Sequence, residues 1–288
     1  MMTVTRPLTG AVVLSCALSG IAAGAPARAA DVGRSATHRV LDVQARRAGL
    51  TTAAGGYPGW AKTTAPAISV RRSAAPPRLV AGAQRGIDVS RYQGNVDWAA
   101  WAATGVTWAY TKATEGTYLR NTYFASQYSG AYKQGLIRGA YHFANPATSS
   151  ATAQAEYFVA NGGGWTADGK TLPGMLDVEN NPYGATCYGL SKTAMVAWIS
   201  AFAARYKQLT SRDVVIYTNS PWWALCTGNS TAFRLSNPLW IAAWTKTLNA
   251  LPGGWPTFTY WQYTDTPIDQ DYFNGSYTRL QVLARNHA

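Results

Sequence analysis

The strongest constraint on the fold is an alternation of short β-rich runs and helix-like stretches across residues 85–288. The β-rich runs are Arg85–Ser90, Val106–Lys112, Arg138–Phe143, Gly174–Val178, Val214–Thr218, Leu239–Trp244 and Thr257–Tyr263, with a last one near Ile268. The helix-like stretches are Val96–Ala103, Tyr123–Gln134, Ala151–Ala160 and Ser191–Leu209. Alternating strands and helices are typical of a parallel α/β fold, and about eight strands predict a closed barrel.

The helical pattern is clearest in Ser191–Leu209. Ser191 is a good N-cap residue, and the apolar side chains recur at helical spacing: Met195, Ile199, Phe202 and Tyr206. By contrast, the last three β-rich runs are too close together in the sequence for full helices between them. We therefore expect the closing part of the barrel to be irregular or partly antiparallel.

The composition excludes several classes of protein. Charged residues make up only 13% of the chain and hydrophobic residues 47%, which argues against a disordered chain or a coiled coil. The net charge of +12 is uneven, because residues 1–84 carry a net +8 and residues 85–288 a net +4. The second part shows no cluster of Lys or Arg, so we expect no nucleic-acid site there. A mild positive field would favour an acidic polymer such as a cell wall.

The N-terminal segment resembles an export signal. Arg6 precedes the apolar run Leu8–Ala23, and Ala27-Arg28-Ala29 matches a small-x-small cleavage pattern. Residues 1–29 are therefore predicted to be a signal peptide of a secreted, extracellular protein without a membrane span. A lipoprotein signal with Cys16 as the modified residue is the alternative. Residues 30–84, rich in Ala, Arg, Thr and Pro, are predicted to be a disordered linker or a pro-segment.

The cysteines fit an oxidising compartment. Without Cys16 of the signal, Cys187 and Cys226 remain as a pair, and a disulfide between them would close a loop of about 40 residues. Two free buried thiols are the alternative. The three histidines are scattered, and no Cys/His cluster has the spacing of metal ligands, so we expect neither a metal nor another cofactor.

The acidic residues are few and follow the strand-like runs. Asp88 ends the first run, Glu115 follows the second, Asp177 and Glu179 end the fourth, and Asp269 follows the last aromatic run. The carboxyl ends of barrel strands converge on one face, where barrel enzymes carry their active sites. Residues i and i+2 of a strand point to the same side, so Asp177 and Glu179 should share a pocket, with Val178 facing away.

Carboxyl groups without metal ligands or a phosphate-binding loop suit glycoside hydrolysis. One carboxyl must donate a proton to the leaving oxygen, while another must stay ionised to stabilise the positive sugar carbon. Crowding of like charges raises the pKa of one member of such a group. Aromatic residues near the strand ends could stack on sugar rings or simply fill the barrel: Tyr110, Tyr141, Tyr217, Trp244, Trp261 and Tyr263.

Several motifs, in order along the chain, resemble glycoside hydrolase family 25, the Chalaropsis-type lysozymes. The opening motif is Arg85-Gly86-Ile87-Asp88-Val89-Ser90-Arg91-Tyr92-Gln93-Gly94. The others include Lys112-Ala113-Thr114-Glu115-Gly116, Gly139-Ala140-Tyr141-His142-Phe143, the Asp177/Glu179 pair, Tyr217-Thr218-Asn219, Leu239-Trp240-Ile241-Ala242 and Trp261-Gln262-Tyr263. The resemblance covers residues 85 to about 275. It implies a modified TIM-like (β/α) barrel of eight strands with fewer than eight helices, and a catalytic domain over residues 85–288.

The resemblance also implies a function. Members of the family hydrolyse the β-1,4 bond between N-acetylmuramic acid and N-acetylglucosamine in bacterial peptidoglycan. By motif, Glu179 is the proton donor, Asp88 and Asp177 are its acidic partners, and Asp269 matches a late aspartate near the cleft. Glu115 matches a family motif in which it contacts substrate or supports the structure. The predicted substrate-binding residues are Glu115, Tyr141, Tyr217, Trp244, Trp261 and Tyr263.

The sequence leaves two alternatives, one for the nucleophile and one for whether the chain is an enzyme. Asp177 could orient the N-acetyl group of the substrate as the nucleophile, or Asp177 or Asp88 could attack directly. A non-catalytic glycan-binding protein on the same barrel is the alternative to an enzyme. We expect a monomer whose partner is the cell-wall glycan.

Overall fold

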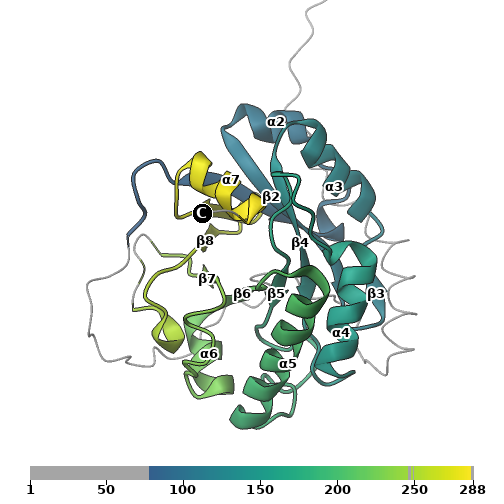
Figure 1. Ribbon diagram of the computed structural model, residues 1–288, viewed down its shortest axis with the longest axis vertical. Coiled ribbons are helices and arrows are strands. Elements are labelled where there is room, and N and C mark those ends of the chain that lie inside the picture. The colour runs from purple at the N-terminus through teal and green to yellow at the C-terminus, as the bar shows by residue number, and fades with distance from the viewer. Residues whose placement is uncertain (1–77, 246–247, 249, 287–288) are drawn as a thin grey trace, which may run out of the picture.

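The computed structural model describes residues 78–245, 248 and 250–286 (Figure 1). Its strands are β1 (Gln84–Val89), β2 (Val106–Glu115), β3 (Leu119–Arg120), β4 (Ile137–Phe143), β5 (Met175–Asp177), β6 (Val215–Thr218), β7 (Leu239–Ala242), β8 (Tyr260–Thr264) and β9 (Gln270–Phe273). Its α-helices are α2 (Trp98–Ala103), α3 (Phe124–Lys133), α4 (Ala151–Phe158), α5 (Lys192–Thr210), α6 (Ser220–Thr227) and α7 (Tyr277–Arg285). The predicted signal peptide (1–29) and most of the predicted linker (30–84) lie outside the described residues.

The strands form a closed barrel. The sheet order is β1-β9-β8-β7-β6-β5-β4-β2-β3, and an additional pairing of β1 with β2 closes the barrel around eight strands, leaving β3 as a short extension. The pairs from β1 to β8 around the barrel are parallel, whereas β9 runs antiparallel to both β8 and β1. The predicted modified barrel and its partly antiparallel closure are therefore confirmed.

The helices cover the barrel unevenly. Figure 1 shows α3, α4 and α5 along one flank, and each of the four predicted helices is present. Between β7 and β8 the described residues form only a short 3-10 turn, Pro252–Gly254. The prediction missed α6 and α7, which are capped by Asn219 and Ser276. Both helices are short. Tryptophan is enriched in strands, so the adjacent pair Trp222 and Trp223 of α6 favours a strand over a helix.

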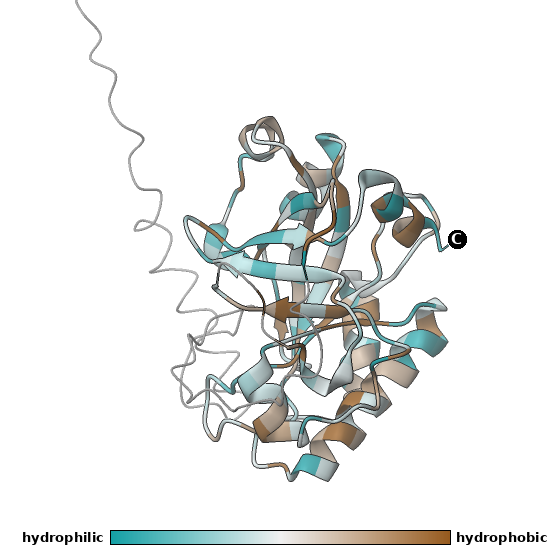
Figure 2. Cartoon of the chain, turned by 90° about the vertical axis from the view of Figure 1, so that its left-hand side faces the viewer, coloured by the Kyte–Doolittle hydropathy of each residue, from teal (hydrophilic) through white to brown (hydrophobic). Residues whose placement is uncertain are grey.

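Alternating strand residues build one core inside the barrel and others between the barrel and its helices. Inside the barrel, aromatic rings fill the space, with Trp108 and Tyr260 at a centroid distance of 4.9 Å. A Cβ atom on Gly86 would lie 2.1 Å from the Trp108 ring, so this strand position requires glycine. Outside the barrel, strand residues such as Leu176 and Ile216 pack against the helices. In Figure 2 the most hydrophobic strand segments run through the middle of the molecule.

The helix α5 buries the face that its sequence pattern predicts. The side chains of its apolar positions are completely buried in the outer core: Met195, Ile199, Phe202 and Tyr206. Ser191 caps the helix by accepting a hydrogen bond from the backbone N–H of Ala194 at 3.2 Å. No helix among the described residues has the length and apolar character needed to cross a membrane.

The predicted disulfide between Cys187 and Cys226 is present. It joins the segment between β5 and α5 to the helix α6. Because the two cysteines are 39 residues apart in the sequence, the bond restricts a sizeable loop in the unfolded chain.

Replacing both cysteines by serine should lower the free energy of unfolding by about 4 kcal/mol, the loop-closure entropy of such a span. Urea unfolding of the wild type and of Cys187→Ser/Cys226→Ser measures the difference. Chemical reduction of the wild type should produce the same loss. An unchanged free energy of unfolding in both cases would contradict a stabilising role for this bond.

Candidate active site

Four acidic residues meet at the carboxyl end of the parallel strands. Asp88 stands near the end of β1, Asp177 ends β5, and Glu179 follows two residues later. Asp269 comes just before β9, and because β9 is antiparallel, its start lies at the same end of the barrel. The backbone N–H of Asp88 donates to the carbonyl of Asp269 at 3.3 Å. All four side chains are buried.

Two buried tyrosines lie close to all four of these acids. Burial, and then the charges of the four acids, raise the pKa of Tyr141 well above its usual value. The pKa of Tyr217 is raised in the same way by burial and by the same four side chains. Both rings belong to the core inside the barrel. Tyr141, Tyr217 and the four acids therefore lie close together at the mouth of the barrel.

The side chains at the end of β5 face the sides that the sequence pattern predicts. Asp177 and Glu179 are both completely buried and influence the same two tyrosines. Val178, between them, belongs to the outer core between strands and helices. The alternation of side chains therefore sends both carboxyl groups into the barrel, as the sequence predicts.

A hydrogen-bond chain fixes Asp88. The side-chain amide of Gln262 on β8 donates to Asp88 Oδ2 at 3.0 Å, and the hydroxyl of Tyr217 donates to Gln262 Oε1 at 2.8 Å. Asp271 lies further along β9 and accepts from the indole N–H of Trp240 at 3.1 Å. The predicted site omits both Gln262 and Asp271. Strand alternation from Tyr260 and from Asp269 could have found them.

Crowding and burial shift the protonation of the cluster. Burial is the main cause that raises the pKa of Asp88 to about 7, while the hydrogen bond from Gln262 opposes it. Burial also raises the pKa of Asp177 well above its usual value; Lys112 opposes this rise and Asp88 adds to it. The pKa values of Asp269 and Asp271 are raised by burial and then by Asp88. The cluster therefore retains protons near neutral pH.

Glu115 has a different environment. Its carboxylate forms an ion pair with Lys112 at 2.6 Å, and both side chains are buried. Burial tends to raise the pKa of Glu115, but the charge of Lys112 and hydrogen bonds outweigh it, so the pKa lies below its usual value. Both carboxylate oxygens have protein partners. This arrangement favours support of the structure over direct substrate contact.

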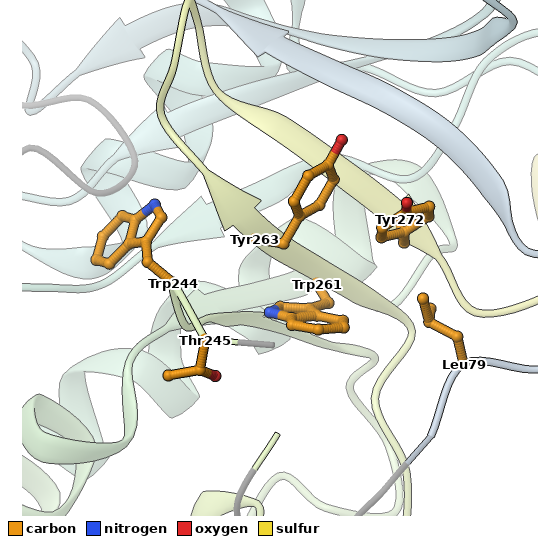
Figure 3. A pocket seen from close by; sticks show the side chains of 6 residues that line it. All are labelled: Leu79, Trp244, Thr245, Trp261, Tyr263 and Tyr272. Atoms are coloured by element: carbon orange, nitrogen blue, oxygen red, sulfur yellow. The ribbon is translucent and has the colours of Figure 1, made fainter. Parts of the chain in front are cut away.

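Three predicted aromatic residues line a groove of about 500 Å³ together with Leu79, Thr245 and Tyr272 (Figure 3). Gln262 points into the barrel, so its neighbours Trp261 and Tyr263 lie on the outer face of β8. Tyr263 stacks on Tyr272 at a centroid distance of 4.6 Å. The structure thus places Trp261 and Tyr263 on the opposite face of β8 from the acids. Trp244, after β7, completes one side of the groove.

No group of three or more His, Cys, Asp or Glu side chains in the described part of the chain is arranged to hold a metal ion. The chemistry available at the barrel mouth is that of carboxyl groups, tyrosine hydroxyls and the Gln262 amide. Such a set can donate a proton, stabilise a cation and bind polar groups of a sugar.

Known proteins resemble this chain over the same region. A family model described as Glycosyl hydrolases family 25 matches residues 87–272. Lysozyme M1 of Streptomyces globisporus is 50% identical over 212 residues, which are 71% of this chain and 72% of that protein. The N,O-diacetylmuramidase of Chalaropsis sp. is 46% identical over 207 residues, covering 69% and 98% of the two chains.

Solved structures of muramidases and lysozymes are similar to this chain over the same region. The muramidase from Acremonium alcalophilum is 52% identical with a TM-score of 0.70, over 70% of this chain and 99% of that chain. The bacterial lysozyme from Streptomyces coelicolor is 49% identical with a TM-score of 0.70, over 73% and 100%. The barrel, the acids at its mouth and these matches together show that the chain belongs to glycoside hydrolase family 25.

Proposed function

We propose that this chain, a lysozyme of glycoside hydrolase family 25, hydrolyses the β-1,4 bond between N-acetylmuramic acid and N-acetylglucosamine in bacterial peptidoglycan. The observation that carries the proposal is the buried group of carboxyls at the barrel mouth, with Asp177 and Glu179 two residues apart on one side of the chain. Relatives named lysozyme and N,O-diacetylmuramidase support the choice of bond.

Glu179 is the proposed proton donor. It follows the end of a barrel strand, is buried, and forms a side-chain hydrogen bond with Asp177. In the proposed reaction, Glu179 protonates the oxygen of the leaving sugar while the anomeric carbon becomes positively charged. After the bond breaks, the same carboxylate can take a proton from the incoming water.

Asp177 and Asp88 are the proposed acidic partners. Lys112 opposes the burial that raises the pKa of Asp177, and Gln262 holds Asp88 in a fixed direction. In its ionised form, Asp177 can either orient the substrate's own N-acetyl group for attack or attack the sugar directly. Asp269, whose backbone carbonyl accepts from the N–H of Asp88, is proposed as a further acidic residue of this site. Tyr141 and Tyr217 form part of the wall of the same space.

The proposed location is outside the cell, and the proposed state is a monomer. The signal pattern of residues 1–29 and the disulfide between Cys187 and Cys226 both suit export. The protein isolated from culture medium should begin at residue 30 or later and elute as a single chain. An intact mass that still includes residues 1–29, or elution as a dimer, would contradict this part of the proposal.

Replacing Glu179 by Gln should lower the release of reducing ends from purified peptidoglycan by about a hundredfold or more, because Gln keeps the shape but cannot donate the proton. Glu156→Gln is a matched control, since Glu156 is an exposed residue of α4 that pairs with Arg205. The control should retain full activity. Equal activity in Glu179→Gln and the control would remove Glu179 as the acid.

The raised pKa of Asp88 predicts a pH-dependent stability. The folded protein retains a proton on Asp88 up to about pH 7, whereas the unfolded chain releases it near the ordinary value of 3.8. Between these values the folded state binds more protons, so raising the pH lowers the stability, by about 1.4 kcal/mol per pH unit for one group. Asp88→Asn should remove this contribution from the slope of unfolding free energy against pH.

The difference in slope between the variants measures Asp88 together with the groups whose pKa values its charge raises, Asp177, Asp269 and Asp271. His142 works in the opposite direction, because burial lowers its pKa from 6.5 to about 4. Asp213→Asn serves as a control, since Asp213 lies at the surface and pairs with Lys207. Urea unfolding at several pH values between 4 and 7 gives the slopes. Identical slopes for Asp88→Asn and the wild type would contradict the raised pKa.

A further inference from the structure

The segment between β5 and α5 begins immediately after the proposed acid. It spans residues 180–190 and therefore sets the direction in which the chain leaves Glu179. Within it, the backbone N–H of Tyr183 donates to Asn181 Oδ1 at 2.9 Å, which closes a turn. Contacts that fix the position of this segment therefore also restrict the position of Glu179.

One attachment of the segment is buried and charged. Glu115 Oε2 accepts from Lys112 Nζ at 2.6 Å, and Glu115 Oε1 accepts from the hydroxyls of Tyr118 (2.6 Å) and Tyr183. Since hydrogen bonds to a buried carboxylate are stronger than neutral ones, this group is a firm point of attachment. Lys112 supplies the compensating charge, so Glu115 can stay ionised inside the protein.

The two tyrosines on Glu115 differ in what they connect. Tyr118 lies in the turn that follows β2, only three residues from Glu115, and its hydroxyl also accepts from the side-chain amide of Asn145 at 3.1 Å; neither contact reaches the segment after Glu179 along the backbone. Tyr183 is 68 residues away along the chain, and its hydrogen bond joins the segment after Glu179 to β2. Tyr183 is therefore the one that can transmit the position of β2 to the proposed acid.

The far end of the segment has its own attachments. The disulfide joins Cys187 to Cys226 of α6, and the indole N–H of Trp222 on α6 donates to the carbonyl of Thr186 at 3.1 Å. Tyr188, at φ 57°, is buried close enough to Asp177 and Glu179 that their charges affect its pKa. The segment is thus held at both ends and returns beside the acids that it leaves.

We propose that Tyr183, bound to the Lys112–Glu115 ion pair, is a positioning residue that fixes the segment 180–190 and thereby the direction of the Glu179 carboxyl. The proposal rests on Glu179 being the proton donor. In this proposal Glu115 anchors Tyr183 and does not contact the substrate. Loss of this single hydroxyl should leave substrate binding nearly intact but move the acid away from the leaving oxygen.

The test compares Tyr183→Phe with Tyr132→Phe, which removes the hydroxyl of an exposed tyrosine of α3. We expect Tyr183→Phe to lower kcat about ten- to a hundredfold, the usual effect of a small misplacement of a catalytic group, with KM within about twofold of the wild type. Tyr132→Phe should keep the wild-type kcat. Hydrogen exchange should rise in residues 180–190 of Tyr183→Phe only.

Equal kcat values in the two variants would overturn the positioning role. A Tyr183→Phe variant with a raised KM and an unchanged kcat would overturn it as well. A double variant Tyr183→Phe/Glu115→Gln provides a second measurement. If Tyr183 acts through Glu115, the double variant loses no more than the larger single loss; a product of the two single losses would contradict the coupling. Failure of the wild type to release reducing ends would instead refute the proposed function, so the two failures are distinguishable.

Discussion

The burial of several carboxyl groups at one end of a barrel is the constraint on which the site depends. Separated aspartates and glutamates would remain ionised in water, whereas Asp88, Asp177 and Asp269 are buried together and their pKa values rise. The folded chain must compensate for this cost elsewhere. The aromatic packing inside the barrel and the outer core around α5 are the contacts large enough to do so.

Two kinds of carboxyl group result from this arrangement. At the barrel mouth, burial raises the pKa values of Asp88, Asp177 and Asp269, so these carboxyls hold their protons to higher pH than free aspartates do. Glu115 lies next to Lys112 and accepts hydrogen bonds from tyrosines, so its pKa is lowered and it stays charged. The first kind suits acid–base chemistry, while the second suits a fixed point of attachment. Local charge and hydrogen bonding, and not residue type, separate the two.

Much of the fold and of the acid cluster was predictable from local patterns. Strand alternation placed Asp177 and Glu179 on the same side, and the crowded final strands indicated an antiparallel closure, which β9 provides. The sequence analysis does not predict α6, whose paired tryptophans favour a strand, nor α7, which comes after the last predicted strand. The same alternation places Trp261 and Gln262 on opposite sides of β8, so the predicted contact of Trp261 with sugar stays a prediction for the face away from the acids. Contacts such as that of Tyr183 with Glu115 join residues 68 positions apart, so no local pattern could predict them.

The central claim concerns which bond is cleaved, and the product ends decide it most directly. A defined peptidoglycan is digested, the products are reduced with borohydride, and the reduced sugars are identified by mass spectrometry. Cleavage between N-acetylmuramic acid and N-acetylglucosamine leaves reduced N-acetylmuramic acid at the new ends. Reduced N-acetylglucosamine at the new ends, or no new ends at all, would contradict the account.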